Sequence, residues 1–452
     1  MSSRLLLALA LCVFFFATAQ AHSEPSLEAT VADLSERLSA VEEENQQLRW
    51  LVETTACDSQ PHQPHPINLS GRIHVDYWAF PGDSPGTNAF DSGSATISPQ
   101  DRLELRRARL AVEGELPLDV LYKLDFEFSE ASDPEFRDLY IGWDDLPWLG
   151  QLLIGNQKRP YGLDHLNSSN FNVFMERPFV VQAFNRNNRR FGIASHNVSA
   201  NENWNWRFGI FNLREIQSDG VFASDHYQLE LAGRIARSIY DRCDESRYAH
   251  MAIAASYAEP DGVPTPGREV NQARFRTEPE ARTNSQWLDT GVIDGAEDYG
   301  ILGLESAVNL GKFQVTTEYL NLWLDRRAGM GEPLHFHGGY VQISYFLTDH
   351  FQPWNRRLGI IDRVTTLERS NCRSCWRPAW QAAVRWSFAD LTDHDVQGGV
   401  GESIAAGLNW YWSPRARLQF NCLYGEISDH APVDGFTSGT YTAIGTRVLV
   451  DF

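Results

Sequence analysis

The sequence predicts an all-β protein: a transmembrane antiparallel β-barrel of about 16 strands, preceded by an N-terminal α-helical coiled coil. After residue 67, short segments alternate apolar and polar residues, the period of strands with one apolar face. Aromatic residues gather at segment ends, as in "LNWYWSP" (408–414), which is typical of the girdles at membrane interfaces. The chain ends on a strand, "AIGTRVLVDF" (443–452), with an aromatic last residue that resembles the C-terminal assembly signal of outer-membrane barrels.

Residues 1–21 predict a secretory signal peptide. Arg4 precedes the apolar run 5–16, and small residues follow at 17–21. This run is too short to span a membrane, and no later run of about 18 apolar residues occurs. A helical membrane protein is therefore excluded, and the mature chain is expected to be exported.

Residues 22–53 predict a periplasmic coiled-coil segment. Its core positions follow each other in steps of four and three: Leu27, Val31, Leu34, Leu38, Val41, Asn45, Leu48 and Val52. The alternative is a single amphipathic helix packed on a globular neighbour. Residues 54–67, with three prolines, predict an extended linker.

The barrel domain is predicted to span residues 68–452. We expect strands near 68–79, 102–115, 118–129, 136–145, 150–158, 190–200, 204–213, 226–239, 247–258, 298–309, 312–324, 337–348, 378–390, 402–413, 415–427 and 441–452. Sixteen is an even number of strands, and it leaves both chain ends of the barrel in the periplasm.

The connections are predicted to alternate in length. External ones are long, at 80–101, 159–189 and 259–297, and internal ones are mostly short, at 116–117, 309–312 and 413–414. Residues 359–368 also have the composition of a strand. Counting them would give an odd number, so we assign them to a long periplasmic connection. That connection also holds Cys372 and Cys375, for which a local disulfide or free thiols is favoured over zinc.

The basic residues are distributed unevenly. The formal net charge is −20, yet 36 of the 39 basic residues are arginine, with lysine only at positions 123, 158 and 312. Arginine binds carboxylate or phosphate groups with a planar fork, although genomic codon bias is an equal explanation.

One arginine cluster, "DRLELRRARLAVEGEL" (101–116), lies in a predicted strand. Alternation places Arg107 and Arg109 on the lumen face, because charge on the lipid face costs about 2–4 kcal/mol at the membrane centre. Arg106 is out of phase. We expect it at a bulge, at a subunit interface or near the membrane rim.

Several stretches together resemble the phosphate-selective porins O and P. They are "LRRARLAVEGEL", "LLIGNQKRPYGLDHLNSSNFNVFMER", "RRFGIA", "GGYVQISYFLT", "WQAAVRWSFADL" and "SIAAGLNWYWSPRARLQFNCLYGEIS". The resemblance implies outer-membrane homotrimers of 16-stranded barrels. It also implies a third external loop, here 159–189, that folds inward and narrows each pore.

The resemblance also implies a central anion site. Carried over by motif, its residues are Arg107, Asp138, Ser168 and Arg177, while His165 stands at the family's lysine position. Histidine titrates near neutrality, so we expect phosphate block weaker than is typical of the family and increasing as pH falls. The alternation pattern alone ranks Arg107 first as the arginine that contacts the anion, followed by Arg109 and then Arg106.

Two further lumen arginines of the family fall near Gln228 and Ala232, where neighbouring Arg234 and Arg237 either substitute or face elsewhere. Within the third loop, four arginines against two acids leave a charge of +2; these are Arg159, Arg177, Arg186, Arg189, Asp164 and Glu176. A cationic constriction of this kind selects anions. The alternative is that these charges pair internally or face solvent.

The expected function is an anion-preferring channel for passive uptake of phosphate, pyrophosphate or similar small oxyanions. The alternative is a general diffusion porin that tethers the outer membrane to the cell wall or a periplasmic partner through its coiled coil. An outer-membrane hydrolase using Ser168 or Ser169 with His165 is disfavoured, because no nucleophile elbow surrounds them. Outer-membrane lipid is an expected partner. We expect no nucleic acid partner, no cofactor and no metal.

Overall fold

The computed structural model describes residues 37–43, 46, 67–130, 133–185, 188–216, 228–241, 244–260, 271–365 and 378–452. The chain divides into two compact units, Met1–Pro64 and His65–Phe452. In the first unit, residues 37–43 and 46 are helical, with Leu38 and Val41 exposed. The signal peptide and most of the coiled-coil and linker segments lie outside the described residues, so the structure does not support the coiled coil and it stays a prediction. No helix in the described ranges is long and apolar enough to cross a membrane.

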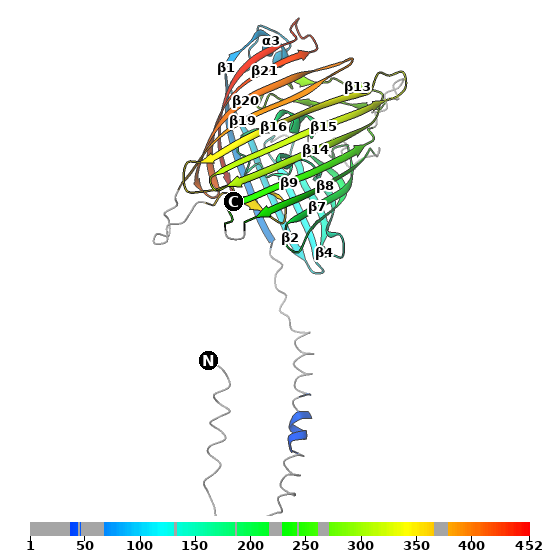
Figure 1. The fold of residues 1–452 in the computed structure, drawn as a ribbon, viewed down its shortest axis with the longest axis vertical. Coiled ribbons are helices and arrows are strands. Elements are labelled where there is room, and N and C mark those ends of the chain that lie inside the picture. The colour runs from blue at the N-terminus through cyan, green and yellow to red at the C-terminus, as the bar shows by residue number, and fades with distance from the viewer. Residues whose placement is uncertain are drawn as a thin grey trace, which may run out of the picture. The chain divides into compact units, whose positions relative to one another are not determined.

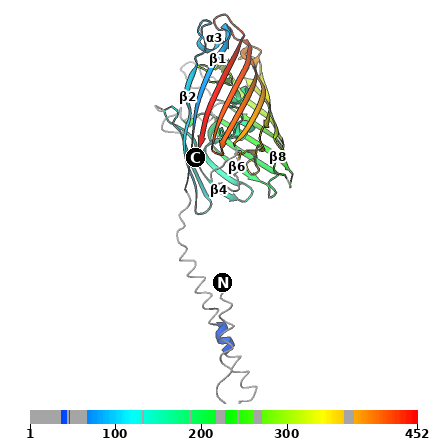
Figure 2. The same cartoon turned by 90° about the vertical axis from the view of Figure 1, so that its left-hand side faces the viewer.

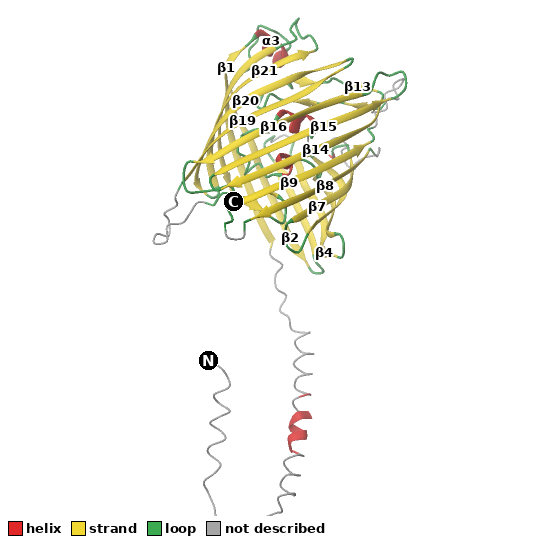
Figure 3. Ribbon diagram, in the orientation of Figure 1, coloured by secondary structure: helices red, strands yellow, loops and turns green. Residues whose placement is uncertain are grey.

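The second unit is a closed barrel of sixteen strands (Figures 1 and 3). In order, the strands are β1 (Ile67–Asp83), β2 (Arg102–Leu116), β3 (Val120–Glu127), β4 (Glu135–Leu146), β5 (Gly150–Lys158), β6 (Arg189–Val198), β7 (Trp204–Asn212), β8 (Leu229–Tyr240), β9 (Arg247–Ala258), β14 (Ala296–Leu310), β15 (Phe313–Arg326), β16 (Leu334–Phe346), β19 (Ala379–Asp393), β20 (Val396–Ser413), β21 (Ala416–His430) and β22 (Gly439–Asp451). Each pairs antiparallel with its neighbours, and β1 closes the barrel against β22 (Figure 2). The predicted fold class and strand number of the barrel are confirmed.

The two faces of the barrel wall differ in polarity. Along β1, exposed Ile73, Val75 and Tyr77 alternate with fully buried His74 and Asp76. Large apolar side chains are likewise exposed on the outer face of the other strands. An apolar exterior around a polar interior is the arrangement of a barrel that contacts lipid outside and encloses a lumen.

The connections alternate in length as predicted, except that the one between β19 and β20, at the end with the long connections, has only two residues, 394–395. At one end they are tight, at 117–119, 147–149, 311–312 and 414–415, and at the other end 84–101, 159–188 and 259–295 are long. The first long connection carries α3 (Pro85–Ser92). The last carries two small two-stranded sheets that alternation did not predict, β10 (Gln272–Ala273) with β13 (Ile293–Asp294) and, between them in the chain, β11 (Arg276–Thr277) with β12 (Leu288–Asp289).

The exception at the tight end is the connection between β16 and β19, residues 347–378. It contains a two-stranded hairpin, β17 (Trp354–Asn355) with β18 (Ile360–Ile361). The described part of 359–368, residues 359–365, therefore adds no strand to the barrel, as predicted. We call its described part, residues 347–365, the inner segment, because barrel-wall side chains bind its backbone. The pair Cys372 and Cys375 lies outside the described residues.

A bulge interrupts β2 at Arg106. His74 of β1 lies opposite Arg107, whereas the next residue, Val75, lies opposite Leu105. Arg106 is therefore an extra residue on this strand, and both arginines line the same interior cavity. Of the three positions considered for Arg106, the bulge is confirmed.

The connection between β5 and β6, residues 159–188, is called the third loop. Its described part, 159–185 and 188, lies within the barrel. It carries two short helices, α4 (Leu163–Leu166) and α5 (Phe179–Phe184), drawn in red inside the strands of Figure 3. In α5, Phe179 and Val180 are fully buried in the main apolar cluster of the barrel interior, and Val180 lies close to Gly338 of β16. This packing fixes the loop against the wall.

Candidate functional site

Two adjoining cavities are lined by the third loop and the barrel wall. The first, of about 240 Å³, is bordered by six arginines and six carboxylates, and we call it the mixed-charge cavity. The second, of about 170 Å³, is the cationic cavity. It is lined by eight cationic side chains and one carboxylate: Arg72, Arg107, Arg109, Lys123, Arg137, Lys158, Arg177, Arg189 and Asp138. Both cavities share Arg107, Arg137, Arg177 and Asn188.

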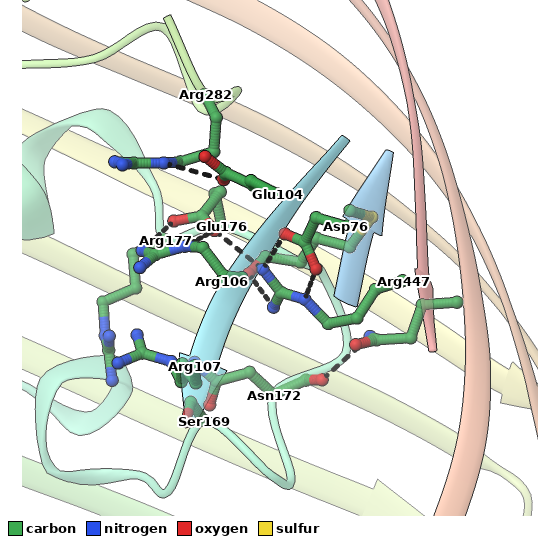
Figure 4. Close-up of polar contacts among 12 residues, drawn as sticks. Asp76, Glu104, Arg106, Arg107, Ser169, Asn172, Glu176, Arg177, Arg282 and Arg447 are labelled. Carbon is green, nitrogen blue, oxygen red and sulfur yellow. Dashed lines mark hydrogen bonds and ion pairs between the residues drawn. The ribbon is translucent and has the colours of Figure 1, made fainter. Parts of the chain in front are cut away.

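The bulge in β2 sends two adjacent arginines to different partners. Arg106 donates to both carboxylate oxygens of Glu176, in the third loop, at 2.8 and 3.0 Å (Figure 4). The nearest carboxylate to Arg107 is Glu127, at 3.8 Å, and the buried Nε of Arg107 has no partner. Glu127 is instead bound by Arg109 at 2.7 Å. Arg107 is thus less neutralised than its neighbours Arg106 and Arg109.

A second bulge brings Arg137 and Asp138 to the same cavity. Together they lie opposite the single residue Asp125, so both consecutive side chains reach the interior. Arg189 donates to both oxygens of Asp138, at 2.7 and 2.8 Å. The predicted site aspartate is present, but its charge is already compensated. Arg137 binds Glu135 at 2.9 Å through one nitrogen, and its Nε is buried without a partner.

The lysine of the site comes from an unexpected position. His165 is buried, its Nε2 lies 3.0 Å from the Arg159 carbonyl, and its ring stacks near Tyr161. Burial, with the cations Lys158, Arg177 and Arg159, holds the pKa of His165 well below its ordinary value. A desolvated imidazole among cations favours its neutral form, so the structure argues against the expected protonation of His165 near neutral pH.

Lys158, at the end of β5, lines the cationic cavity seven residues before His165 in the chain. Its Nζ donates to the carbonyls of Leu166 and Asn167, at 2.8 and 2.9 Å. The sequence does contain this lysine, in "GNQKRP", but motif alignment assigned the family position to His165.

The serines of the third loop face an arginine of β1. Arg72 Nη1 donates to the hydroxyls of Ser168 and Ser169, at 3.3 and 3.2 Å, and all three residues line the cationic cavity. Arg177 is paired with Asp164 at 3.0 Å. Arg107, Asp138, Ser168, Arg177 and Arg109 therefore meet in one cavity, while Arg106 and His165 line the mixed-charge cavity.

The net charge of the third loop does not create this cationic surface. Arg159 pairs with Glu230 at 2.8 Å, and Arg177 and Arg189 pair with carboxylates as described above; Arg186 lies outside the described residues. The wall residues Arg72 and Arg107 contribute the uncompensated charge instead. Arg72 lies on the polar face of β1 with His74 and Asp76, and the register, which sets it opposite Arg109, brings it to the site.

Of the two arginines near the positions suggested for further lumen arginines, one faces the lumen and the other faces outward. Arg234 faces inward, where it binds Glu305 and the Gly359 carbonyl. Arg237 lies on the outer face of β8 over the ring of Trp204, so it lines no lumen cavity.

Carboxylates of the loop and the wall hold the third loop in place. Arg447 of β22 binds Asp76 of β1 and also reaches Glu176 at 2.8 Å, which adds a second wall contact to this loop residue (Figure 4). Glu318 of β15 accepts the backbone N–H groups of Leu163 and Asp164, at 2.7 and 2.6 Å. These contacts attach the loop to strands on different sides of the lumen.

A closed sixteen-stranded barrel with an apolar exterior and a charged, cavity-containing interior defines a porin of the outer membrane. The chain belongs to the phosphate-selective porin O and P family, whose family model matches residues 67–451. Membership in this family indicates a channel rather than an enzyme. Among the described residues, no group of three or more His, Cys, Asp or Glu side chains is placed to hold a metal ion.

The similar proteins agree with this fold. An uncharacterized protein of Caulobacter vibrioides is 26% identical over 466 residues, covering 94% of this chain and 90% of its own length. In vitro-folded OmpT, an outer membrane protein of Vibrio cholerae, matches with a TM-score of 0.51 at 10% identity and covers 86% of this chain and 99% of that one. A loop-deletion mutant of OmpT matches with a TM-score of 0.52, also at 10% identity, covering 85% and 99%. At this identity, the likeness concerns the fold alone.

Proposed function

We propose that this porin conducts small anions and prefers oxyanions of the phosphate type. The observation that carries the proposal is the cationic cavity, where eight cationic side chains face a single carboxylate that Arg189 already binds. A cluster of cations in a low-dielectric wall raises the local concentration of anions, whatever the net charge of the whole chain.

The proposed path runs from the mixed-charge cavity to the cationic cavity past Arg107, Arg137 and Arg177, which line both. The third loop narrows the lumen there. An entering oxyanion accepts hydrogen bonds from the guanidinium groups of Arg107 and Arg137, which line both cavities. Several weak, shared donors suit conduction, because an anion must bind well enough to enter and weakly enough to leave.

Preference for phosphate over other anions rests on the geometry of the donors. Guanidinium groups present planar forks that match the oxygens of phosphate, and Arg72 holds two hydroxyls, Ser168 and Ser169, at the same cavity. The Lys158 ammonium already donates to two carbonyls, so it acts mainly as a fixed charge rather than a free donor.

Planar-bilayer recording tests the proposal. Purified protein is placed in a potassium chloride gradient, the reversal potential is measured, and phosphate is then added to compete with chloride current. We expect an anion-selective reversal potential and block by phosphate at lower concentration than by acetate. A cation-selective reversal potential contradicts the proposal, and equal block by both anions restricts it to a general anion porin.

We further propose that the porin is a homotrimer and that residues 27–52 join the three subunits as a coiled coil. Deleting these residues discriminates two roles. Loss of trimers in native electrophoresis supports subunit clamping, whereas intact trimers with a weakened cell envelope support tethering to the cell wall or a periplasmic partner.

A further inference from the structure

The inner segment reaches the third loop from the opposite end of the barrel. The backbone N–H of Ile361 donates to the side-chain oxygen of Asn167 at 3.0 Å. The preceding residue, Ile360, lines the cationic cavity. Asn167 is almost fully buried, with 2% of its surface exposed, so water does not readily replace this hydrogen bond.

The same asparagine holds two cations of the cavity. Its backbone carbonyl accepts from Lys158 Nζ at 2.9 Å and from Arg177 Nη2 at 3.4 Å. Its backbone N–H donates to the Leu163 carbonyl at 2.9 Å, which fixes it at the end of α4. The side chain of Asn167 thus binds the inner segment while its main chain orients cations of the site.

The inner segment is itself attached to the wall along three adjacent strands. Arg207 of β7 donates to the Leu358 carbonyl at 2.8 Å, and Arg234 of β8 donates to the Gly359 carbonyl at 2.9 Å. Tyr248 of β9 donates to the Gln352 carbonyl at 2.9 Å. The wall therefore holds the inner segment in place, and the inner segment in turn holds Asn167 of the third loop.

We propose that Asn167 is the positioning residue through which the inner segment sets the anion affinity of the cationic cavity. The inference rests on the proposed anion-channel function. When the segment is docked, the Asn167 carbonyl is held where Lys158 and Arg177 converge. When the hydrogen bond between Ile361 and Asn167 is lost, the Asn167 carbonyl moves. Lys158 and Arg177 then move away from the cavity, and anions bind less tightly.

The test compares Asn167→Ala with a matched buried asparagine of the same loop, Asn172→Ala. Asn172 contacts Asp164 and carries no contact to the inner segment. The measured quantity is the sulfate concentration that halves the chloride current, with the unblocked single-channel conductance recorded separately. We expect Asn167→Ala to raise the half-blocking concentration about three- to tenfold, the effect of one lost hydrogen bond, with Asn172→Ala near wild type.

A second variant perturbs the contact from the other side. Gly359 has a φ of +62°, and an added Cβ would lie 3.4 Å from Arg234 Nη1, so Gly359→Ala strains the inner segment without touching the third loop. If the proposal holds, the effects of Gly359→Ala and Asn167→Ala on sulfate block are not additive, because both break one linkage. If Asn167→Ala does not assemble, Gly359→Ala alone must still weaken the block.

The outcomes separate this inference from the proposed function. A wild-type channel that is not anion selective overturns the proposed function. An anion-selective wild type whose sulfate block is unchanged in both variants overturns the role of Asn167 alone. A higher conductance with unchanged block means that the inner segment only obstructs the pore, and this also overturns the proposal.

Discussion

Arg106 and Glu176 form a bidentate ion pair, at 2.8 and 3.0 Å, that joins the second strand to the third loop. Arg107, the next residue, approaches a carboxylate only to 3.8 Å. The two arginines therefore have different roles. Arg106 holds the third loop, while Arg107 offers the charge of its guanidinium group to the anion path that we propose.

Replacing Arg107 by glutamine removes this charge without changing the loop contacts. Hydrogen bonds to charged groups are worth about 1.5–3 kcal/mol, so we expect the half-blocking concentration of sulfate to rise about tenfold or more. Single-channel titration measures it. The control is Arg237→Gln on the outer face of β8, which should leave selectivity unchanged. An equal effect of both variants would contradict a specific role for Arg107.

His165 should add no pH dependence to block by sulfate between about pH 8 and 5.5. The lowered pKa of His165 keeps its imidazole neutral across this window, so no positive charge appears as pH falls through the ordinary histidine range. Sulfate is the appropriate probe because its own charge is constant there, unlike that of phosphate. A block that strengthens on acidification in wild type, and not in His165→Gln, would show that the histidine does titrate.

Replacing Asp138 by asparagine should increase anion selectivity. The change releases the Arg189 guanidinium from its only bidentate partner among the described residues and removes the single carboxylate that lines the cationic cavity. We expect the chloride-to-potassium permeability ratio to rise about two- to fivefold, the effect of one partly screened charge. A fall in this ratio indicates that Asp138 is needed to orient Arg189.

Replacing Glu318 by glutamine should loosen the third loop while the barrel stays folded. Glu318 accepts two backbone N–H groups and the Tyr340 hydroxyl, and the amide leaves at least one buried donor unpaired, at a cost of about 1–3 kcal/mol. Open-channel current noise should increase, with little change in the heat needed to unfold the barrel in detergent. Tyr340→Phe, which spares the backbone contacts, serves as the control, and its open-channel current noise should be lower than that of Glu318→Gln.

Much of the fold is predictable because alternation is a local property of each strand. The strand number, the alternating connection lengths and the exclusion of residues 359–368 from the barrel all follow from it and from the need for an even number of strands. The two small sheets within residues 259–295 are not predictable in this way. They have two residues per strand, too few to show a period.

The site is less predictable, because cross-strand register and loop packing decide it. Alternation assigns Arg107 and Arg109 to the lumen and anticipates a bulge at Arg106. It cannot show that Arg72 meets Ser168 and Ser169, which lie nearly a hundred residues away in the chain. The motif alignment assigned the lysine position to His165, whereas the fold supplies a lysine from the preceding strand.

The bulge in β2 also changes how densely a strand can carry charge. In a regular strand, every second side chain faces inward, so inward charges on one strand are about 7 Å apart along it. At Arg106 and Arg107, two consecutive residues face inward, and the linear charge density of the wall doubles locally. The bulge also reverses the phase of everything after it. Deleting Arg106 would therefore remove the bulge together with one inward cation, because Leu105 and Arg107 already lie opposite the consecutive residues Val75 and His74, and both halves of the strand would keep their charged residues out of the lipid.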